Sequence, residues 1–160
     1  MKSPAAVFVD VQNIYYTTRQ TFGRQFNYTR LWQMLSEEFD LRIANAYAIH
    51  SGNEGQLKFQ NALKKIGFTV RLKPYIQRRD GSAKGDWDVG ITIDVLEAAA
   101  SIDTVILLSG DGDFDLLLER VKSAHSVTPI VYGVKALTAA SLIDSASEFR
   151  EIDTDLLMPQ

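Results

Sequence analysis

Residues 104–115 read TVILLSGDGDFD, and the fold expected for this chain follows from this stretch. Its first five residues, Thr104–Leu108, are mostly apolar and β-branched, which is typical of a buried parallel strand. The leucines after Asp115 have the spacing of an amphipathic helix. Asp111, Asp113 and Asp115 therefore lie where a strand ends and a helix begins. In open α/β sheets ligands bind at this edge, because the loops there converge above a rigid sheet.

Three common motifs with similar residues do not fit this stretch. A calcium-binding EF-hand loop needs glycine at its sixth position and glutamate at its twelfth, where this chain has Leu116 and Lys122. A dinucleotide-binding loop needs a third glycine, and the acids here would repel a pyrophosphate. A P-loop needs Gly-Lys-Ser or Gly-Lys-Thr, which the sequence lacks. Asp115 alone is explained equally well as an acid in the first turn of a helix, but three acids together indicate a site.

The composition indicates one globular domain. At 160 residues, the chain is long enough for one well-buried core and too short for two comfortable ones. It contains no cysteine, which excludes disulfides, thiolate zinc sites and a cysteine nucleophile, and which fits an intracellular compartment. No stretch approaches the length of a membrane span, and the apolar residues 4–9 are too few for a signal peptide. We therefore expect residues 1–160 to form a single cytoplasmic domain without membrane contact.

Strand-like and helix-like segments alternate along the whole chain. This alternation predicts an α/β fold, a single three-layer α/β/α sandwich with a mainly parallel sheet. In the Rossmann-like strand order 3-2-1-4-5, the first and fourth strands are neighbours at the point where the winding reverses. Strands are expected over residues 5–11, 42–49, 68–76, 104–108, 127–134 and 149–152, and helices over residues 28–39, 54–66, 86–100, 113–124 and 137–145.

The sequence also predicts the conformation of two further segments and the buried side of one helix. Segment 14–27 mixes aromatic residues with Arg19 and Arg24 and is expected to be a loop, whose aromatic side chains either stack nucleic-acid bases or pack on a partner. Residues 77–85 are expected to form a polar turn, as a flap or hairpin tip. In the helix over residues 86–100, the inward-facing apolar stripe is expected to consist of Val89, Ile93, Leu96 and Ala100.

Opposite charges are separated along the chain. Residues 58–84 carry eight lysines and arginines and a single acid, a net charge of +7, whereas residues 85–160 carry fourteen acids and four bases, a net charge of −10. A basic segment beside an acidic centre suits an enzyme that holds a polyanion over a metal ion. The residues expected to contact the substrate are Lys73, Arg78, Arg79, Lys84 and Ser109.

Four aspartates are expected to meet at the carboxyl edge of the sheet. Asp10 ends the first strand, Asp111 and Asp113 follow the fourth, and Asp88 lies at the start of the helix that leads back into the fourth. Carboxylates gathered so closely repel one another unless protons or a cation neutralise them. Hard oxygen ligands without thiols select Mg²⁺ or Mn²⁺. Asp94 is open to two interpretations, a fifth acid of the site or a residue of the helix surface.

Three blocks of the sequence resemble the signature blocks of the NYN domains, in the same order. They are Val7–Asn13, Lys84–Val89 and Ser109–Phe114. NYN domains belong to the PIN-like nuclease superfamily, and the chain resembles its LabA-like bacterial branch in particular. The resemblance implies metal-dependent cleavage of RNA, although some members of the family are regulators. It also implies that Asn13 helps to position phosphate or water, and that the metal-binding acids are Asp10, Asp88, Asp111 and Asp113.

The main functional hypothesis is a Mg²⁺- or Mn²⁺-dependent ribonuclease that hydrolyses phosphodiester bonds of RNA, preferably single-stranded. One alternative is a non-catalytic regulatory or protein-interaction domain with the same fold. Another is a metal-dependent phosphatase or nucleotidase that acts on a small substrate. The oligomeric state stays open, and a homo-oligomer is compatible with the sequence. The catalytic residues of the main hypothesis are Asp10, Asn13, Asp88, Asp111 and Asp113.

Overall fold

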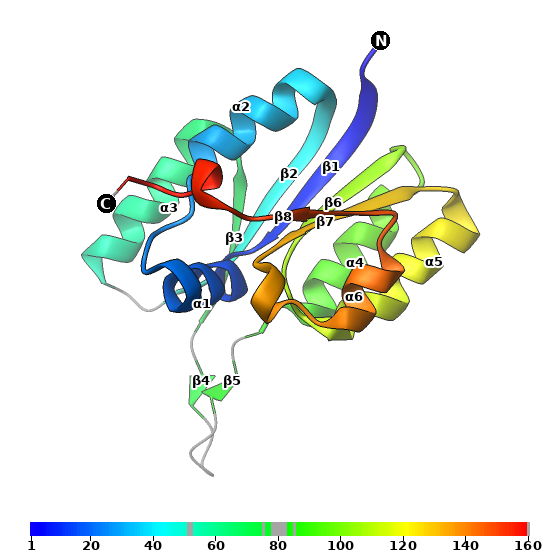
Figure 1. Cartoon of the computed structure of the whole chain (residues 1–160). Coiled ribbons are helices and arrows are strands. Elements are labelled where there is room, and N and C mark those ends of the chain that lie inside the picture. Colours follow the sequence, from blue (N-terminus) through cyan, green and yellow to red (C-terminus); the bar gives the residue numbers. More distant parts are fainter. Residues whose placement is uncertain (51–52, 75, 78–82, 85, 160) are drawn as a thin grey trace.

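A six-stranded sheet with the order β3-β2-β1-β6-β7-β8 forms the centre of the molecule (Figure 1). All neighbouring strands of this sheet pair in parallel. The predicted order 3-2-1-4-5 is confirmed, and the last short strand joins the sheet as a sixth member beside β7. The strands are β1 (Ser3–Asp10), β2 (Phe39–His50), β3 (Thr69–Pro74), β6 (Thr104–Leu108), β7 (Thr128–Gly133) and β8 (Glu148–Glu151). The structure is a computed structural model that describes residues 1–50, 53–74, 76–77, 83–84 and 86–159.

Helices cover both faces of the sheet, which confirms the predicted three-layer arrangement. In Figure 1, α1, α2 and α3 lie on one side of the sheet and α4, α5 and α6 on the other. Alternate residues of β1 divide between two cores, because successive strand side chains point to opposite faces: Val7 and Val9 pack with the first group of helices, Ala6 and Phe8 with the second. The helices are α1 (Val11–Phe22), α2 (Tyr28–Glu38), α3 (Glu54–Ile66), α4 (Asp88–Ala98), α5 (Asp115–His125) and α6 (Ala140–Ser145).

The loop expected over residues 14–27 is wrong, because α1 starts directly after β1 and ends only at Phe22. Val11, Ile14 and Thr18 recur at helical spacing and are buried under the sheet. Gly23 ends the helix in the left-handed conformation, with φ of 64°. The aromatic residues of segment 14–27 therefore differ in their exposure to solvent. Phe26 is buried and Phe22 is half-buried, whereas Tyr15 and Tyr16 face the solvent.

The stripe predicted to face inward on α4 is also wrong. Ile91, Val95 and Ala98 are buried, whereas the exposed fractions of Val89, Ile93 and Leu96 are 69%, 50% and 36%, and Ala100 is exposed. Apolar residues lie on nearly all sides of this helix, so the periodicity alone does not select the buried side. Trp87, just before the helix, decides the orientation: its buried indole N–H donates to the Ala48 carbonyl at 2.9 Å and so fixes the start of α4 against β2.

The polar turn expected over residues 77–85 is described only at its two arms. There, β4 (Ile76–Gln77) pairs antiparallel with β5 (Ala83–Lys84), as expected for a hairpin. The tip between the arms, including Arg78 and Arg79, lies outside the described residues. Among the described residues, no helix combines the length and the apolar character that a membrane span requires.

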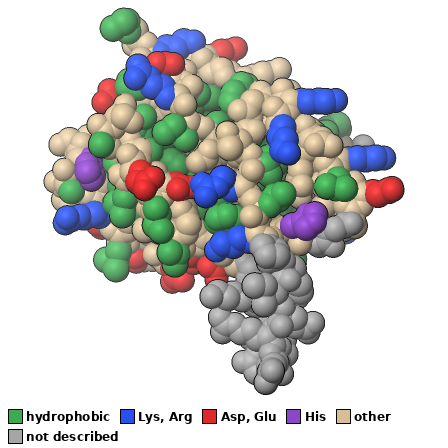
Figure 2. Space-filling view, turned by 180° about the vertical axis from the view of Figure 1, so that it is seen from behind, with side chains coloured by type: hydrophobic (Ala, Val, Ile, Leu, Met, Phe, Trp, Pro, Cys, Tyr) green, Lys and Arg blue, Asp and Glu red, His purple; other side chains and the backbone are tan. Residues whose placement is uncertain are grey.

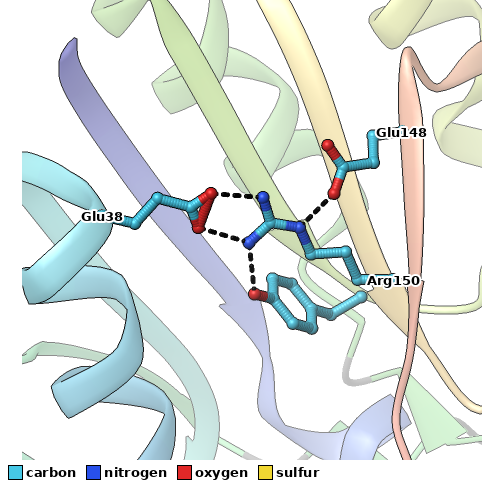
Figure 3. Close-up of polar contacts among 4 residues, drawn as sticks. Glu38, Glu148 and Arg150 are labelled. Carbon is cyan, nitrogen blue, oxygen red and sulfur yellow. Dashed lines mark hydrogen bonds and ion pairs between the residues drawn. The ribbon is translucent and has the colours of Figure 1, made fainter.

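The edge strand β8 is joined to α2 by Arg150 (Figure 3). The guanidinium of Arg150 forms a two-pronged ion pair with Glu38, with donor–acceptor distances of 2.6 and 2.7 Å, and it also donates to the hydroxyl of Tyr132 at 2.9 Å. Its Nε donates to the carboxylate of Glu148 on the same strand. A single side chain thus connects β8, β7 and the end of α2.

Candidate metal centre

The candidate site lies where β1 and β6 end side by side. The two strands are neighbours in register, with Val9 opposite Leu108, so Asp10 and Ser109 come out of the sheet at the same edge. This edge is the point where the winding of the sheet reverses, and it is the usual ligand position in such folds. The neighbouring positions of β1 and β6 put Asp10 and the loop after β6 at the same edge of the sheet.

Ser109 connects the acids of the two strands. Its side chain is fully buried, and its hydroxyl donates to Oδ2 of Asp10 and accepts from the N–H of Asp111, both at 3.1 Å. Asn13, in the first turn of α1, ties the same loop from the other side, because its Oδ1 accepts from the N–H of Gly110 at 2.8 Å. Two polar side chains from different elements therefore hold the loop after β6 in place.

A glycine is required at position 110 of this loop. A Cβ atom on Gly110 would lie 2.6 Å from the backbone carbonyl oxygen of Leu137, closer than such atoms approach. The loop after β6 consequently lies directly against the loop after β7, and the Gly110 carbonyl accepts from the N–H of Ala139 at 3.0 Å. This contact holds the following acids close to the sheet.

Asp88, Asp111 and Asp113 converge at this edge. Each offers one carboxylate oxygen, and these three oxygens all lie within 4.8 Å of one another. Asp111 also accepts a hydrogen bond from the N–H of Asp113 at 2.9 Å, so it caps the short helical turn η1 (Gly112–Phe114) that carries Asp113. Asp88 is the first residue of α4 and so approaches from a different element than Asp111 and Asp113. Asp88 and Asp111 are half-buried, and Asp113 is exposed.

The ionisation of Asp10 and Asp88 is disfavoured in this arrangement. Burial raises the pKa of Asp10 to about 6, against the hydrogen bond from Ser109, which lowers it. Burial and the neighbouring Asp111 raise the pKa of Asp88 to about 7, and Asp10 also contributes through its charge. Among the described side chains, no ion pair includes Asp10, Asp88, Asp111 or Asp113. An acidic group without a basic partner has the donor chemistry of a hard divalent cation site, so the residues fit Mg²⁺ or Mn²⁺.

Comparison with known proteins decides the family. The family model of the NYN domain matches residues 4–153. The chain belongs to the NYN domain family. The resemblance found in the sequence blocks is confirmed by this match, and the match spans all six strands of the sheet.

Two relatives of this NYN domain cover nearly its full length. The low amplitude and bright protein LabA of Synechococcus elongatus is 28% identical over 94% of this chain and 86% of its own. A crystal structure of a protein of unknown function from Vibrio parahaemolyticus is 51% identical, with a TM-score of 0.94 over 98% of this chain and 97% of its own. The fold of the domain is therefore shared with an experimentally determined relative.

The residues expected to contact the substrate are placed only in part by the structure of this NYN domain. Lys73 on β3 lies beside the acidic edge: its ammonium group donates to the Asp86 carbonyl at 3.2 Å and sits 4.5 Å from the centroid of the Trp87 ring. Ser109 is buried among the acids rather than at the surface. Arg78 and Arg79 lie outside the described residues, and so does the side chain of Lys84.

Sequence reasoning missed the role of Arg71, and the structure resolves the question of Asp94. Arg71 on β3 pairs with Asp94 on α4 at 2.6 Å, and the same carboxylate oxygen accepts from the hydroxyl of Tyr47 at 2.6 Å. Asp94 is thus an ion-pair partner outside the acidic group. Figure 2 views the molecule from behind, toward the β3 edge, where basic and acidic side chains adjoin. The sequence did contain a signal for the position of Arg71. It lies two residues from Lys73 on the same predicted strand, so the two basic side chains point to the same face.

Proposed function

We propose that this NYN domain is a metal-dependent ribonuclease whose centre is the edge formed by β1, β6 and the start of α4. The observation that carries the proposal is the convergence of three carboxylate oxygens, from Asp88, Asp111 and Asp113, within 4.8 Å of one another. Such a group is costly to assemble without a counter-charge, so its presence supports a bound cation. Membership of the NYN domain family supports a phosphodiester as the substrate.

In this proposal Asp88, Asp111 and Asp113 hold Mg²⁺ or Mn²⁺, and Asp10 completes the set of acids around it. When bound, the ion supplies Lewis acidity toward a phosphate oxygen and lowers the pKa of water. The carboxylate of Asp10 accepts from the hydroxyl of Ser109 at 3.1 Å and from the backbone N–H of Asn13. In this proposal a further acceptor position of the same carboxylate orients a water molecule. Ser109 acts by holding Asp10 and Asp111 and not by touching the substrate.

Asn13 provides a polar donor at the same place. Its Oδ1 is engaged by the N–H of Gly110 at 2.8 Å, which leaves the amide NH₂ group to donate to a phosphate oxygen or to water. Lys73 lies beside Asp86 and offers a cation to the RNA backbone without reading its bases. Arg78, Arg79 and Lys84 belong to the basic segment of the sequence and extend the proposed phosphate contacts.

The test is cleavage of a labelled single-stranded RNA in Mn²⁺, Mg²⁺ or EDTA by the wild type and by Asp111→Asn. The asparagine keeps an oxygen that accepts from the N–H of Asp113, so the turn stays capped while the ligand charge is lost. Asp115→Asn is the matched control, because within the described part of the chain the carboxylate of Asp115 accepts only from the N–H of Leu116 and lies outside the acidic group. We expect metal-dependent cleavage by the wild type and the control, and none by Asp111→Asn.

Two results would contradict the proposal. Cleavage by Asp111→Asn at the wild-type rate would remove the acidic group from the reaction. Hydrolysis of mononucleotides with no effect on RNA would replace the ribonuclease with a phosphatase that uses the same acids.

A further inference from the structure

The outer face of α1 carries two solvent-exposed tyrosines beside the acidic edge. The exposed fractions of Tyr15 and Tyr16 are 45% and 59%. Their rings meet edge to face, with centroids 5.5 Å apart and an angle of 76° between the planes. Arg19 holds the pair, because its guanidinium donates to the Tyr15 hydroxyl at 2.9 Å and lies 5.6 Å from the centroid of that ring. The proposed metal chemistry does not use any of these three side chains.

Tyr16 lies near the end of α1 that starts at the acidic edge. α1 begins immediately after Asp10, and Asn13 in its first turn bonds the loop that carries the acids. Residues three apart on a helix are surface neighbours, with Cβ atoms about 5–6 Å apart, so Tyr16 stands next to Asn13. A strand of nucleic acid held at the acidic edge therefore comes within reach of Tyr16.

The charge of α1 is complementary to a polyanion. Its residues, Val11–Phe22, include Arg19 and no aspartate or glutamate, whereas the chain as a whole has a net charge of −3. An RNA backbone is attracted to Arg19 and is kept off the acids except where a cation neutralises them.

The surroundings of Tyr16 suit a nucleobase better than a protein partner. Its neighbours one turn away along the exposed side of the helix are Gln12 and Gln20, which are polar and exposed. The fully buried centre of a protein interface is usually more apolar than these two glutamines allow. Arg19 covers the ring of Tyr15, but among the described side chains no cation covers the ring of Tyr16.

We propose that Tyr16 stacks a nucleobase of single-stranded RNA next to the acidic edge, while Arg19 contacts a neighbouring phosphate and Tyr15 keeps both side chains in place. The inference rests on the proposed function, since it names the substrate form that the same site prefers. Bases in a duplex are already stacked on each other, so a tyrosine platform selects single strands. Preference for single-stranded RNA then arises on α1 and not at the acids.

The test is the equilibrium binding of a labelled single-stranded RNA of about ten nucleotides, followed by fluorescence anisotropy in EDTA so that cleavage is absent. We expect Tyr16→Leu to weaken binding about 10-fold, since stacking on an aromatic ring contributes about 1–3 kcal/mol per base. Tyr16→Phe keeps the ring and is expected to bind within about 2-fold of the wild type. Arg19→Gln is expected to reduce the salt dependence of binding by about one charge.

Two controls separate stacking from a loss of structure. A blunt-ended RNA duplex of two fully paired strands is expected to bind Tyr16→Leu and the wild type equally, because it has no unpaired base to stack. Circular dichroism melts of the variants are expected to match the wild type, because Tyr16 is exposed.

The outcomes also separate this inference from the proposed function. RNA binding that requires the ring of Tyr16, in a protein that does not cleave RNA with metal, supports the Tyr16 platform and rejects the ribonuclease. Cleavage by Tyr16→Leu and equal binding by all variants overturn the platform and leave the ribonuclease intact. Absence of any binding to single-stranded RNA in EDTA overturns the platform, and the cleavage assay in Mg²⁺ or Mn²⁺ then decides separately on the ribonuclease.

Discussion

Ser109 donates its hydroxyl proton to the carboxylate of Asp10 across 3.1 Å, at the ends of the two central strands. The same hydroxyl oxygen accepts from the N–H of Asp111 at 3.1 Å. A side chain that is fully buried thus supports acids on both strands. The position of the acidic centre depends on this contact as much as on the acids themselves.

Replacement of Ser109 by alanine is the first prediction. The change leaves the carboxylate of Asp10 and the N–H of Asp111 without their shared partner, and such a loss costs about 1–3 kcal/mol of the free energy of unfolding. Urea denaturation measures this cost. Ser101→Ala is the control, because Ser101 is exposed and its hydroxyl donates only to the Ala98 carbonyl. Equal stability of the two variants would show that the hydroxyl of Ser109 does not support the acids.

A second prediction compares two replacements of Asn13. Asn13→Ala removes the acceptor for the N–H of Gly110 and is expected to cost about 1 kcal/mol of the free energy of unfolding. Asn13→Asp keeps the acceptor but adds a negative charge near Asp10. Without metal both variants are therefore expected to melt below the wild type. With Mg²⁺, differential scanning fluorimetry is expected to show a larger gain in melting midpoint for Asn13→Asp than for the wild type or Asn13→Ala. Equal gains by the three proteins would show that residue 13 does not lie beside the bound cation, and no gain by any of them would contradict the proposed cation site.

A third prediction contrasts two acids of α4. Asp88→Asn relieves repulsion with Asp111 and is expected to raise the metal-free melting midpoint by about 2–4 °C, the shift that about 1 kcal/mol gives in a domain of this size. The same variant is expected to lose the stabilisation that Mn²⁺ gives the wild type. Asp94→Asn is expected to lower the midpoint instead, because Asp94 pairs with Arg71 and accepts from Tyr47. A fall in the midpoint of both variants would mean that repulsion at Asp88 is unimportant.

The arrangement of the sheet could be predicted from the sequence because strand and helix segments alternate and crossovers follow few rules. The acidic edge was predicted from this topology, since Asp10 ends β1 and Asp111 follows the end of the neighbouring strand β6. The contacts that fix the acids could not be predicted, because the sequence does not show that the hydroxyl of Ser109 reaches Asp10 or that Asn13 reaches Gly110.

Two of the predictions made from the sequence were wrong, for separate physical reasons. α1 was missed because Tyr15, Tyr16, Thr17 and Thr18 favour strands and loops, and tertiary burial outweighs this preference. The threonine hydroxyls donate back to the carbonyls of Asn13 and Ile14, at 2.8 and 2.7 Å, so their polar groups are satisfied within the helix. The wrong stripe on α4 arose because an apolar helix shows no preferred side, and only Trp87 against β2 determines which side is buried.

The last prediction concerns the ion pair that joins β8 to α2. The hydrogen bond from Arg150 lowers the pKa of Glu38 below its ordinary value of 4.5, so the pair stabilises the fold above that pH and this contribution is lost as the pH falls through the lowered pKa. The Glu38→Gln variant has no carboxyl group at position 38, so it has no such contribution to lose as the pH falls. The free energies of unfolding of wild type and Glu38→Gln, measured in urea from pH 6 to pH 3, are therefore expected to converge at low pH. A difference that stays constant would show that the charge of Glu38 contributes nothing beyond its packing.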